Sequence, residues 1–165
     1  MNALSASRLP ATTGATVSLA GIAFVGAGLW ARREVHAGLA RERIVGTSDS
    51  SPANAPIKNG SAARSLAEAI RRSTVAAADG RTYAETDMFV GVDGSPTSDE
   101  ARAIVDERTG KPVQHPDQTL WLQSTTLQTA LMQAYMGERL ADLTVGLGAA
   151  FFAAGLGLAA VARAS

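Results

Sequence analysis

The chain has no cysteine, few aromatic residues and no net charge. Without cysteine it can form neither a disulfide nor a thiolate metal site. Its 15 basic and 15 acidic residues balance, whereas a nucleic-acid-binding protein usually carries a basic face or stripe. We therefore expect no nucleic acid among its partners. A length of 165 residues allows one domain.

Charge is also absent from two long stretches, Leu9–Ala31 and Leu143–Ala162, and all 15 acidic residues lie between them. As a helix, each stretch is long enough to cross roughly 30 Å of hydrocarbon. Arg8 precedes the first stretch, as a basic residue does in a signal peptide, but the residues after Trp30 make a poor cleavage site. The sequence therefore predicts two uncleaved membrane spans.

Two such spans predict a mainly α-helical fold. We expect an antiparallel two-helix transmembrane hairpin that extends into a membrane-proximal stalk and carries a small, mostly helical and irregular insert. The predicted helices run from about Thr13 to Val45 and from Pro116 to Ala162. The predicted divisions are an N-terminal tail and first span (1–31), a stalk helix (32–45), a polar insert (46–116), a second stalk helix (117–142), and a second span with a short C-terminal tail (143–165).

Small residues recur every seven positions in both spans, at Gly14, Gly21 and Gly28 in the first and at Gly148 and Gly155 in the last. A seven-residue repeat favours left-handed packing of two helices. In lipid, small residues allow the close backbone approach that replaces the missing hydrophobic drive. We expect these five glycines, the glycine seam, to pack the helices together, although a chain rich in Ala and Gly produces part of this pattern by chance.

Three charged residues are expected to meet at the membrane boundary. Aligning the centres of the two spans places Arg32 opposite the stretch between Glu138 and Asp142. We predict an interhelical salt bridge here that sets the register of the hairpin. Its contribution to stability is small if water reaches it.

The middle section is marked by turn residues and short apolar runs. Residues 46–60 are rich in Ser, Pro, Asn and Gly, which predicts an irregular linker. Short helices are expected near 62–75 and 98–107. Met88–Val92 forms either a strand or a packed loop. Large apolar residues are too few for an independent core, so we expect the insert to pack against the stalk helices, with a partner supplying the remainder.

No motif in the chain indicates catalysis or a bound cofactor. An iron site of the two-histidine type would require His36 and His115 to meet beside a carboxylate. Oxygen-bearing side chains alternate in 93–99 as in a calcium loop, but Pro96 intervenes and no distal glutamate lies in register. We therefore expect no catalytic, cofactor-binding or metal-binding residues, and no enzyme activity.

Aromatic and methionine side chains predict an interaction surface at Tyr83, Trp121, Met132, Tyr135 and Met136. Such side chains are common at interfaces, and core packing explains them equally well. The predicted function is a non-enzymatic accessory, assembly or scaffold subunit of a larger membrane or envelope complex. Its expected partners are the lipid bilayer and either a membrane protein or further copies of the chain. The alternative is a ligand-binding or sensory module with the insert as receptor.

The orientation of the spans follows from their flanking residues. Five arginines lie within reach of the spans on the insert side, and a literal positive-inside count would place the insert in the cytoplasm. The rule weakens for loops longer than about 60 residues. Because a first span with a short N-terminal tail can act as a signal anchor, we expect plasma-membrane insertion with cytoplasmic termini and an extracytoplasmic insert.

As a whole, the chain resembles a group of uncharacterised actinobacterial membrane proteins that have a span at each end. The runs that carry this resemblance are Trp30-Ala-Arg32, Leu39-Ala-Arg-Glu-Arg-Ile44, Arg64-Ser-Leu-Ala-Glu68, Arg81-Thr-Tyr-Ala-Glu-Thr-Asp87 and the stretch from Leu120 to Met136. The resemblance implies no activity. Members of the group are sometimes labelled aromatic ring-opening dioxygenases, a label that the two histidines of this chain do not support.

Overall fold

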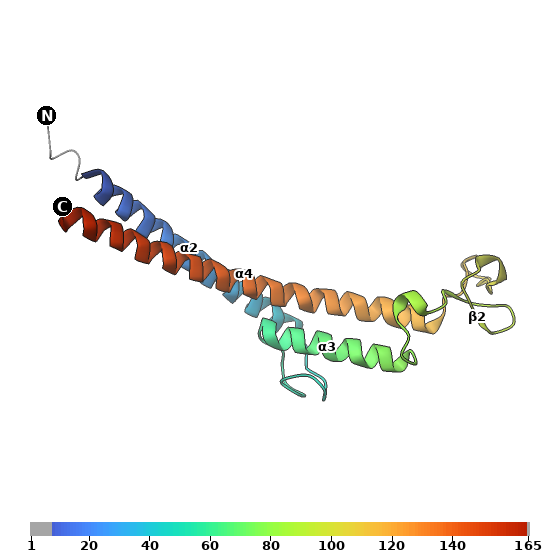
Figure 1. Cartoon of the computed structure of the whole chain (residues 1–165). Coiled ribbons are helices and arrows are strands. Elements are labelled where there is room, and N and C mark those ends of the chain that lie inside the picture. The colour runs from blue at the N-terminus through green and yellow to red at the C-terminus, as the bar shows by residue number, and fades with distance from the viewer. Residues whose placement is uncertain (1–7, 165) are drawn as a thin grey trace. The chain divides into compact units, whose positions relative to one another are not determined.

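The computed structural model describes residues 8–164, with side chains from 12 to 163, and it is mainly helical (Figure 1). Residues 1–7 of the predicted N-terminal tail and the final residue lie outside the described residues. In chain order the elements are α2 (Arg8–Glu42), α3 (Gly60–Ala77), the 3-10 helix η1 (Tyr83–Glu85), β1 (Phe89–Val90), β2 (Pro96–Thr97), the 3-10 helix η2 (Glu100–Arg102) and α4 (Pro116–Ala164).

The chain forms two compact units. Among the described residues, unit 1 comprises 8–44, 57–60 and 134–164, and unit 2 comprises 45–56 and 61–133. Helix α4 contributes to both units. The predicted insert at 46–116 therefore folds together with the first turns of α4, while residues 57–60 belong to unit 1.

In unit 1, α2 lies against the C-terminal part of α4. Gly14 approaches Gly155, and Gly21 approaches Gly148. Because rising residue numbers in α2 meet falling numbers in α4, the two helices run antiparallel in this unit.

Helix α2 ends at Glu42, three residues before the predicted end at Val45. Arg43 has a φ angle of 51°, and a residue in this left-handed conformation commonly ends a helix. The N–H of Ile57 then donates to the carbonyl of Ile44 over 2.9 Å. This hydrogen bond joins residues 57–60 to unit 1.

Helix α3 packs on the first turns of α4 in unit 2. It covers the helix predicted near 62–75 and is two-sided, with Ala63 and Leu66 buried on one side and Glu68 exposed on the other. At the contact with α4, the hydroxyl of Thr74 lies 2.7 Å from the hydroxyl of Ser124.

Residues 88–115 form a lobe of short paired segments. The prediction of a helix near 98–107 is therefore wrong. Asp99 caps a single 3-10 turn, and the chain is extended again by Ala103. The N–H of Ile104 then donates to Val90 over 2.8 Å, and its carbonyl accepts from Val113 at 2.8 Å. β-Branched Ile104 and its valine neighbour fit this extended pairing better than a helix. The run at 88–92 does contain a strand, β1, antiparallel to β2.

A tight turn closes this lobe at residues 106–110. The Asp106 carboxylate accepts hydrogen bonds from the N–H groups of Arg108 and Thr109 and from the Thr109 hydroxyl. The bonds from the Thr109 N–H and hydroxyl, together with the Arg108 N–H, outweigh the effect of burial and lower the pKa of Asp106. The turn is therefore built around a charged carboxylate.

Candidate functional site

Glu138 is a buried acid on α4, with 8% of its surface exposed. Its Oε2 accepts a hydrogen bond from the backbone N–H of Gly60. Its Oε1 lies 2.8 Å from His36 Nε2 and 3.6 Å from Arg32 Nε. One carboxylate thus joins α2, α4 and the segment 57–60 within unit 1.

Arg32 lies close to both acids that the sequence pairs with it. Its Nη1 is 3.4 Å from Asp142 Oδ1, in addition to the contact with Glu138. Asp142 is also 3.8 Å from Arg139 Nη1. Since the Arg32 side chain is 48% exposed, the pair with Asp142 belongs to the class of surface ion pairs that contribute about 0–1 kcal/mol. Glu138, which is more deeply buried, is the member whose loss matters more.

His36 and Gly60 are the members of this cluster that the sequence reasoning missed. His36 follows Arg32 by four residues, and this spacing places both on one side of a helix. That spacing is the signal that could have found His36. Gly60 carries no comparable signal, because every residue except proline has a backbone N–H.

The glycine seam lies in the contact between α2 and α4. A Cβ atom on Gly21 would be 2.5 Å from the nitrogen of Phe152 and 2.6 Å from the carbonyl oxygen of Gly148, whereas ordinary contact begins near 3.4 Å. Across the same contact, the Ser18 hydroxyl donates to the Phe152 carbonyl over 3.3 Å. Larger side chains would force the backbones apart here. All five members are buried: Gly14, Gly21, Gly28, Gly148 and Gly155.

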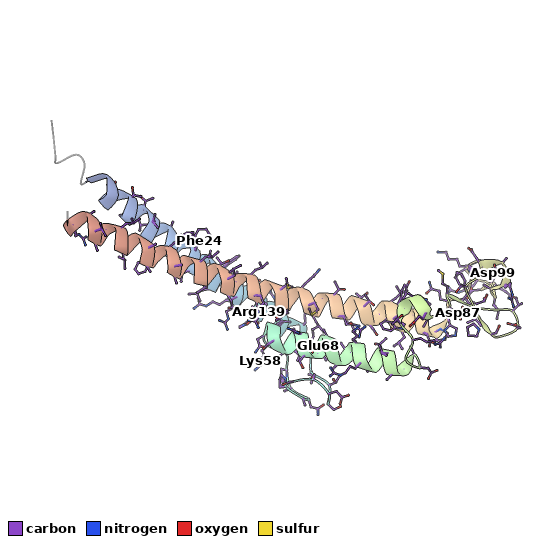
Figure 2. All side chains as sticks on the ribbon, viewed as in Figure 1. Phe24, Lys58, Glu68, Asp87, Asp99 and Arg139 are labelled. Atoms are coloured by element: carbon purple, nitrogen blue, oxygen red, sulfur yellow. The ribbon has the colours of Figure 1, made fainter. Side chains whose placement is uncertain are left out.

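Many large apolar side chains of α2 and α4 in unit 1 are exposed beside this contact. Leu19 is 66% exposed and Leu143 is 58% exposed. Phe24, which Figure 2 labels, is also exposed. Its ring lies beside that of the exposed Phe151, at a centroid distance of 5.9 Å. Each helix contains an 18-residue window apolar enough to cross a membrane, of which only 17% is buried within the structure. The core helix of a soluble protein would be mostly buried. In the two apolar segments of unit 1, glycines therefore lie in the helix contact while many large apolar side chains are exposed; the large buried residues of this unit, Leu39 and Ile57, lie outside those segments.

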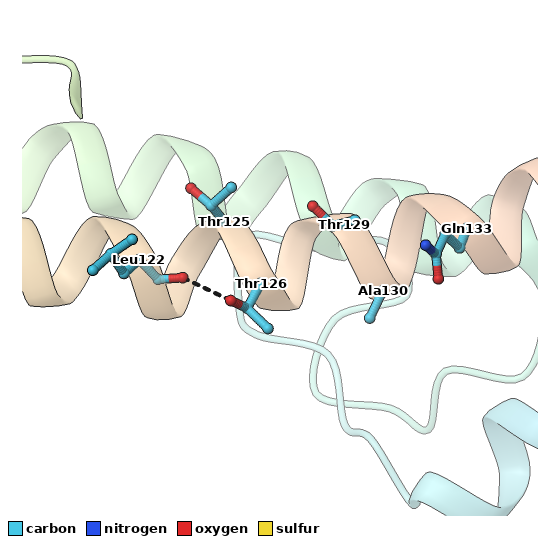
Figure 3. Close-up of a pocket in the computed structure, with 6 residues that line it drawn as sticks. All are labelled: Leu122, Thr125, Thr126, Thr129, Ala130 and Gln133. Carbon is cyan, nitrogen blue, oxygen red and sulfur yellow. Dashed lines mark hydrogen bonds between the residues drawn. The ribbon is translucent and has the colours of Figure 1, made fainter. Parts of the chain in front are cut away.

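A second notable surface lies on α4 in unit 2. Between residues 118 and 133 every exposed position is uncharged. We call this surface the α4 uncharged face: Thr119, Leu122, Gln123, Thr125, Thr126, Leu127, Thr129, Ala130, Met132 and Gln133. It contains an open depression of about 440 Å³ whose lining residues all come from α4 (Figure 3).

The predicted interaction residues differ in their placement. Tyr83, Met132 and Met136 are exposed. Trp121 is only 6% exposed, so its ring cannot offer the predicted surface contact. Tyr135 is half-buried, and the guanidinium of Arg139 lies 5.2 Å from the centre of its ring. Trp121 is held inside by its place on the side of α4 that faces the interior of unit 2.

The residues considered for metal binding have other contacts. His36 contacts Glu138 in unit 1, and His115 Nδ1 lies 3.7 Å from Asp117 Oδ2 in unit 2. Asp93 accepts hydrogen bonds from the hydroxyl and N–H of Ser95, which lower its pKa. Within the described residues, no group of three or more His, Asp or Glu side chains is placed to hold a metal ion.

No protein-family model, curated protein or solved structure matches the chain. The resemblance to actinobacterial two-span membrane proteins therefore remains a prediction from the sequence runs that carry it.

Proposed function

We propose that the chain is an integral membrane protein with two spans, Leu9–Ala31 and Leu143–Ala162. In this proposal α2 and α4 of unit 1 form an antiparallel transmembrane hairpin. Their next turns, at 32–42 and 134–142, form the membrane-proximal start of a stalk. A span of 20 residues rises about 30 Å, which matches the hydrocarbon thickness.

The observation that carries this proposal is the reversed packing of the two span segments in unit 1. Helix pairs in water bury their large apolar residues against each other and expose charge. Here Gly21 and Gly148 face each other, while Leu19 and Leu143 face outward. Close packing of small residues with outward apolar side chains is typical of helices in lipid, because lipid solvates apolar groups as well as a protein core does.

The charged cluster fits the edge of such a hairpin. Arg32 immediately follows the first span, and Asp142 immediately precedes the second. Within the spans a charge would be costly, whereas at the boundary water and headgroups remain within reach. In this proposal Glu138, with its contacts to His36 and Arg32, fixes the register of the two helices where they leave the bilayer.

We further propose that the protein acts as a non-enzymatic accessory, assembly or scaffold subunit of a larger membrane or envelope complex. The support comes from the lobe of unit 2, which exposes apolar side chains. A partner that covered these side chains would remove apolar surface from water. Val92 is 74% exposed and Val105 is 52% exposed, and Met88 is exposed as well. Tyr83, which precedes the lobe in unit 2, is also exposed. We place unit 2 outside the cytoplasm and both termini inside it.

Insertion and orientation can be tested together because the chain has no cysteine. We expect the protein to stay in the membrane pellet after carbonate extraction. A single Ser48→Cys variant, at an exposed position of unit 2, should react with a membrane-impermeant maleimide in intact cells. Release by carbonate would contradict the membrane proposal, and labelling only after lysis would reverse the orientation while leaving the spans in place.

The subunit role is tested by purifying the tagged full-length protein from its native membrane in mild detergent and identifying its companions by mass spectrometry. We expect other membrane proteins to be recovered with the tagged protein in stoichiometric amounts. Recovery without any other protein would contradict the subunit role. It would favour the sensory alternative, for which ligand-dependent changes in thermal stability are the next measurement.

A further inference from the structure

Trp30 is the most exposed aromatic side chain among the described residues, with 68% of its surface exposed. It lies one residue before the end of the uncharged stretch Leu9–Ala31. Tryptophan combines a large apolar ring with one hydrogen-bond donor, so its side chain is best accommodated where apolar groups and hydrogen-bond acceptors lie next to each other. Within the part of the chain that the structure describes, Trp30 has no such surroundings.

Arg33 lies on the same side of α2 as Trp30. The two residues are three positions apart, which makes them neighbours on the surface of a helix. Arg33 is exposed and is about 4.5 Å farther along the helix axis. Because the Cα–Cβ bonds of a helix tilt toward its N-terminus, the side chain of Arg33 begins in the direction of Trp30.

Arg33 differs from the other arginines next to the spans because it has no acidic partner. Arg32 contacts both Glu138 and Asp142, and Arg139 contacts Asp142 over 3.8 Å. Arg33 forms no ion pair with any of the described residues. Its charge is therefore available to an anion from outside the chain.

We propose that Trp30 and Arg33 bind the headgroup of an anionic phospholipid. The guanidinium of Arg33 holds a phosphate through two parallel hydrogen bonds. The N–H of Trp30 donates to a lipid oxygen, and its ring packs on the first carbons of the acyl chains. The positive charge favours an anionic lipid over a zwitterionic one.

The position of the pair selects a lipid over a soluble anion. Trp30 and Arg33 lie where the uncharged part of α2 ends, and this part has an apolar window of which only 17% is buried in the structure. The site rests on the proposed transmembrane hairpin, and it adds a lipid class and a depth to it. Tryptophan is enriched at the level of the headgroups, where hydrocarbon and polar groups meet.

Arg43 provides a matched control for Arg33. It is exposed in unit 1 and, like Arg33, forms no ion pair with any residue that the structure describes. Arg43 follows Arg33 by ten residues, roughly 15 Å along a helix. The headgroup layer on one side of a bilayer is only about 5–8 Å thick. A headgroup bound at Trp30 and Arg33 is therefore out of reach of Arg43.

The depth of Trp30 is tested by fluorescence quenching in the full-length protein, reconstituted into phosphatidylcholine vesicles. The lipid carries bromine either near the headgroup end of its acyl chains or near the chain ends. The Trp30→Phe variant gives the signal of the second tryptophan, Trp121, which is subtracted. Leu19→Trp in the Trp30→Phe chain reports the middle of the span, at a position where 66% of the side chain is exposed. We expect the shallow bromine to quench Trp30 more strongly than the deep bromine does, and the reverse order at position 19.

The lipid class is tested in vesicles with equal amounts of phosphatidylglycerol and phosphatidylcholine, of which only one carries the shallow bromine. We expect brominated phosphatidylglycerol to quench Trp30 more strongly, by a ratio of up to about fivefold, the preference that one arginine gains near an anionic surface. Arg33→Gln should bring this ratio to one, and Arg43→Gln should leave it as in the wild type. High salt should reduce the ratio because it screens exposed charges.

The results distinguish failure of this site from failure of the hairpin. If neither bromine quenches the tryptophan at position 19, the first span does not lie in the bilayer and both proposals fail. If the deep bromine quenches position 19 while Trp30 is quenched by neither bromine, or equally by both, the headgroup site is overturned and the hairpin stands. An equal effect of the two lipids on Trp30, or a preference that persists in Arg33→Gln, would also overturn the site.

Discussion

Replacing one glycine of the seam with alanine should lower the stability of unit 1, whereas the same replacement two residues away should raise it. Gly148 and Gly146 both lie in α4 within unit 1. A Cβ on Gly148 would lie 2.7 Å from the carbonyl oxygen of Gly21 and from the nitrogen of Val25, whereas a Cβ on Gly146 would meet nothing within 4 Å. Gly148→Ala and Gly146→Ala are therefore a matched pair.

The magnitude follows from that distance. Ordinary contact begins near 3.4 Å, so the backbone of α2 must retreat by about 3.4 − 2.7 = 0.7 Å at Gly148. A gap of this size forfeits about a quarter to a half of the dispersion energy of each neighbouring contact. Overpacking of this kind costs about 1–3 kcal/mol, and the higher helix propensity of alanine returns about 0.5–1 kcal/mol. We expect Gly148→Ala to destabilise unit 1 and Gly146→Ala to stabilise it slightly.

The assay measures separation of the two helices directly. Cysteines introduced at the exposed positions Ala15 and Ala160 carry a donor and an acceptor dye, and energy transfer is followed as dodecyl sulfate is titrated into mild-detergent micelles. The midpoint should fall for Gly148→Ala and stay or rise for Gly146→Ala. Equal midpoints for the two variants would refute the close approach at the seam.

Three further predictions concern the polar groups. In the same dodecyl sulfate titration, Glu138→Gln should lower the stability of the helix pair by about 1–3 kcal/mol because it weakens buried contacts. Asp142→Asn should lower it by less than about 1 kcal/mol. Equal losses would contradict the central place of Glu138. The side-chain amide nitrogen of Gln128 is buried and has no hydrogen-bond acceptor among the described residues. Gln128→Met removes this unpaired group and should therefore raise the melting temperature of unit 2. A lower melting temperature would contradict the prediction. The pKa of Asp106 is lowered in the folded turn, so its contribution to the stability of the fold is present above the ordinary carboxyl pKa and is lost as the pH falls through the folded pKa. NMR titration of Thr109→Ala should show a higher pKa for Asp106 than in the wild type. An unchanged pKa would contradict the hydrogen bonds as its cause.

The parts of the fold that could be predicted from the sequence are those governed by a period or a local signal. Pro116 is the first residue of α4, as predicted, because proline suits the first turn of a helix. The helix expected near 98–107 failed because its apolar residues satisfy a helix and a strand equally over so short a run. Pairing with residues distant in sequence, such as the bond from Ile104 to Val90, decided the outcome.

The candidate site shows the same division. Span alignment identified Arg32, Glu138 and Asp142 as neighbours, and the structure brings their charged atoms within 3.6 Å. The approach of the Gly60 N–H depends on where a loop of irregular structure returns to the helices. Such a path is set by many weak tertiary contacts, and no local pattern in the sequence records it.

The size of the buried residues along α4 gives an independent estimate of where a bilayer would begin. In unit 2 the buried side includes large residues, Trp121 and Leu131. In unit 1 beyond Glu138 it consists of Ala141, Gly148, Gly155 and Ala162. Water favours burial of large apolar groups, whereas lipid removes that drive and leaves close backbone packing as the gain. The change from large to small buried residues falls between Leu131 and Ala141. This position lies close to the last charged residues before the uncharged span, although it is found from residue size alone.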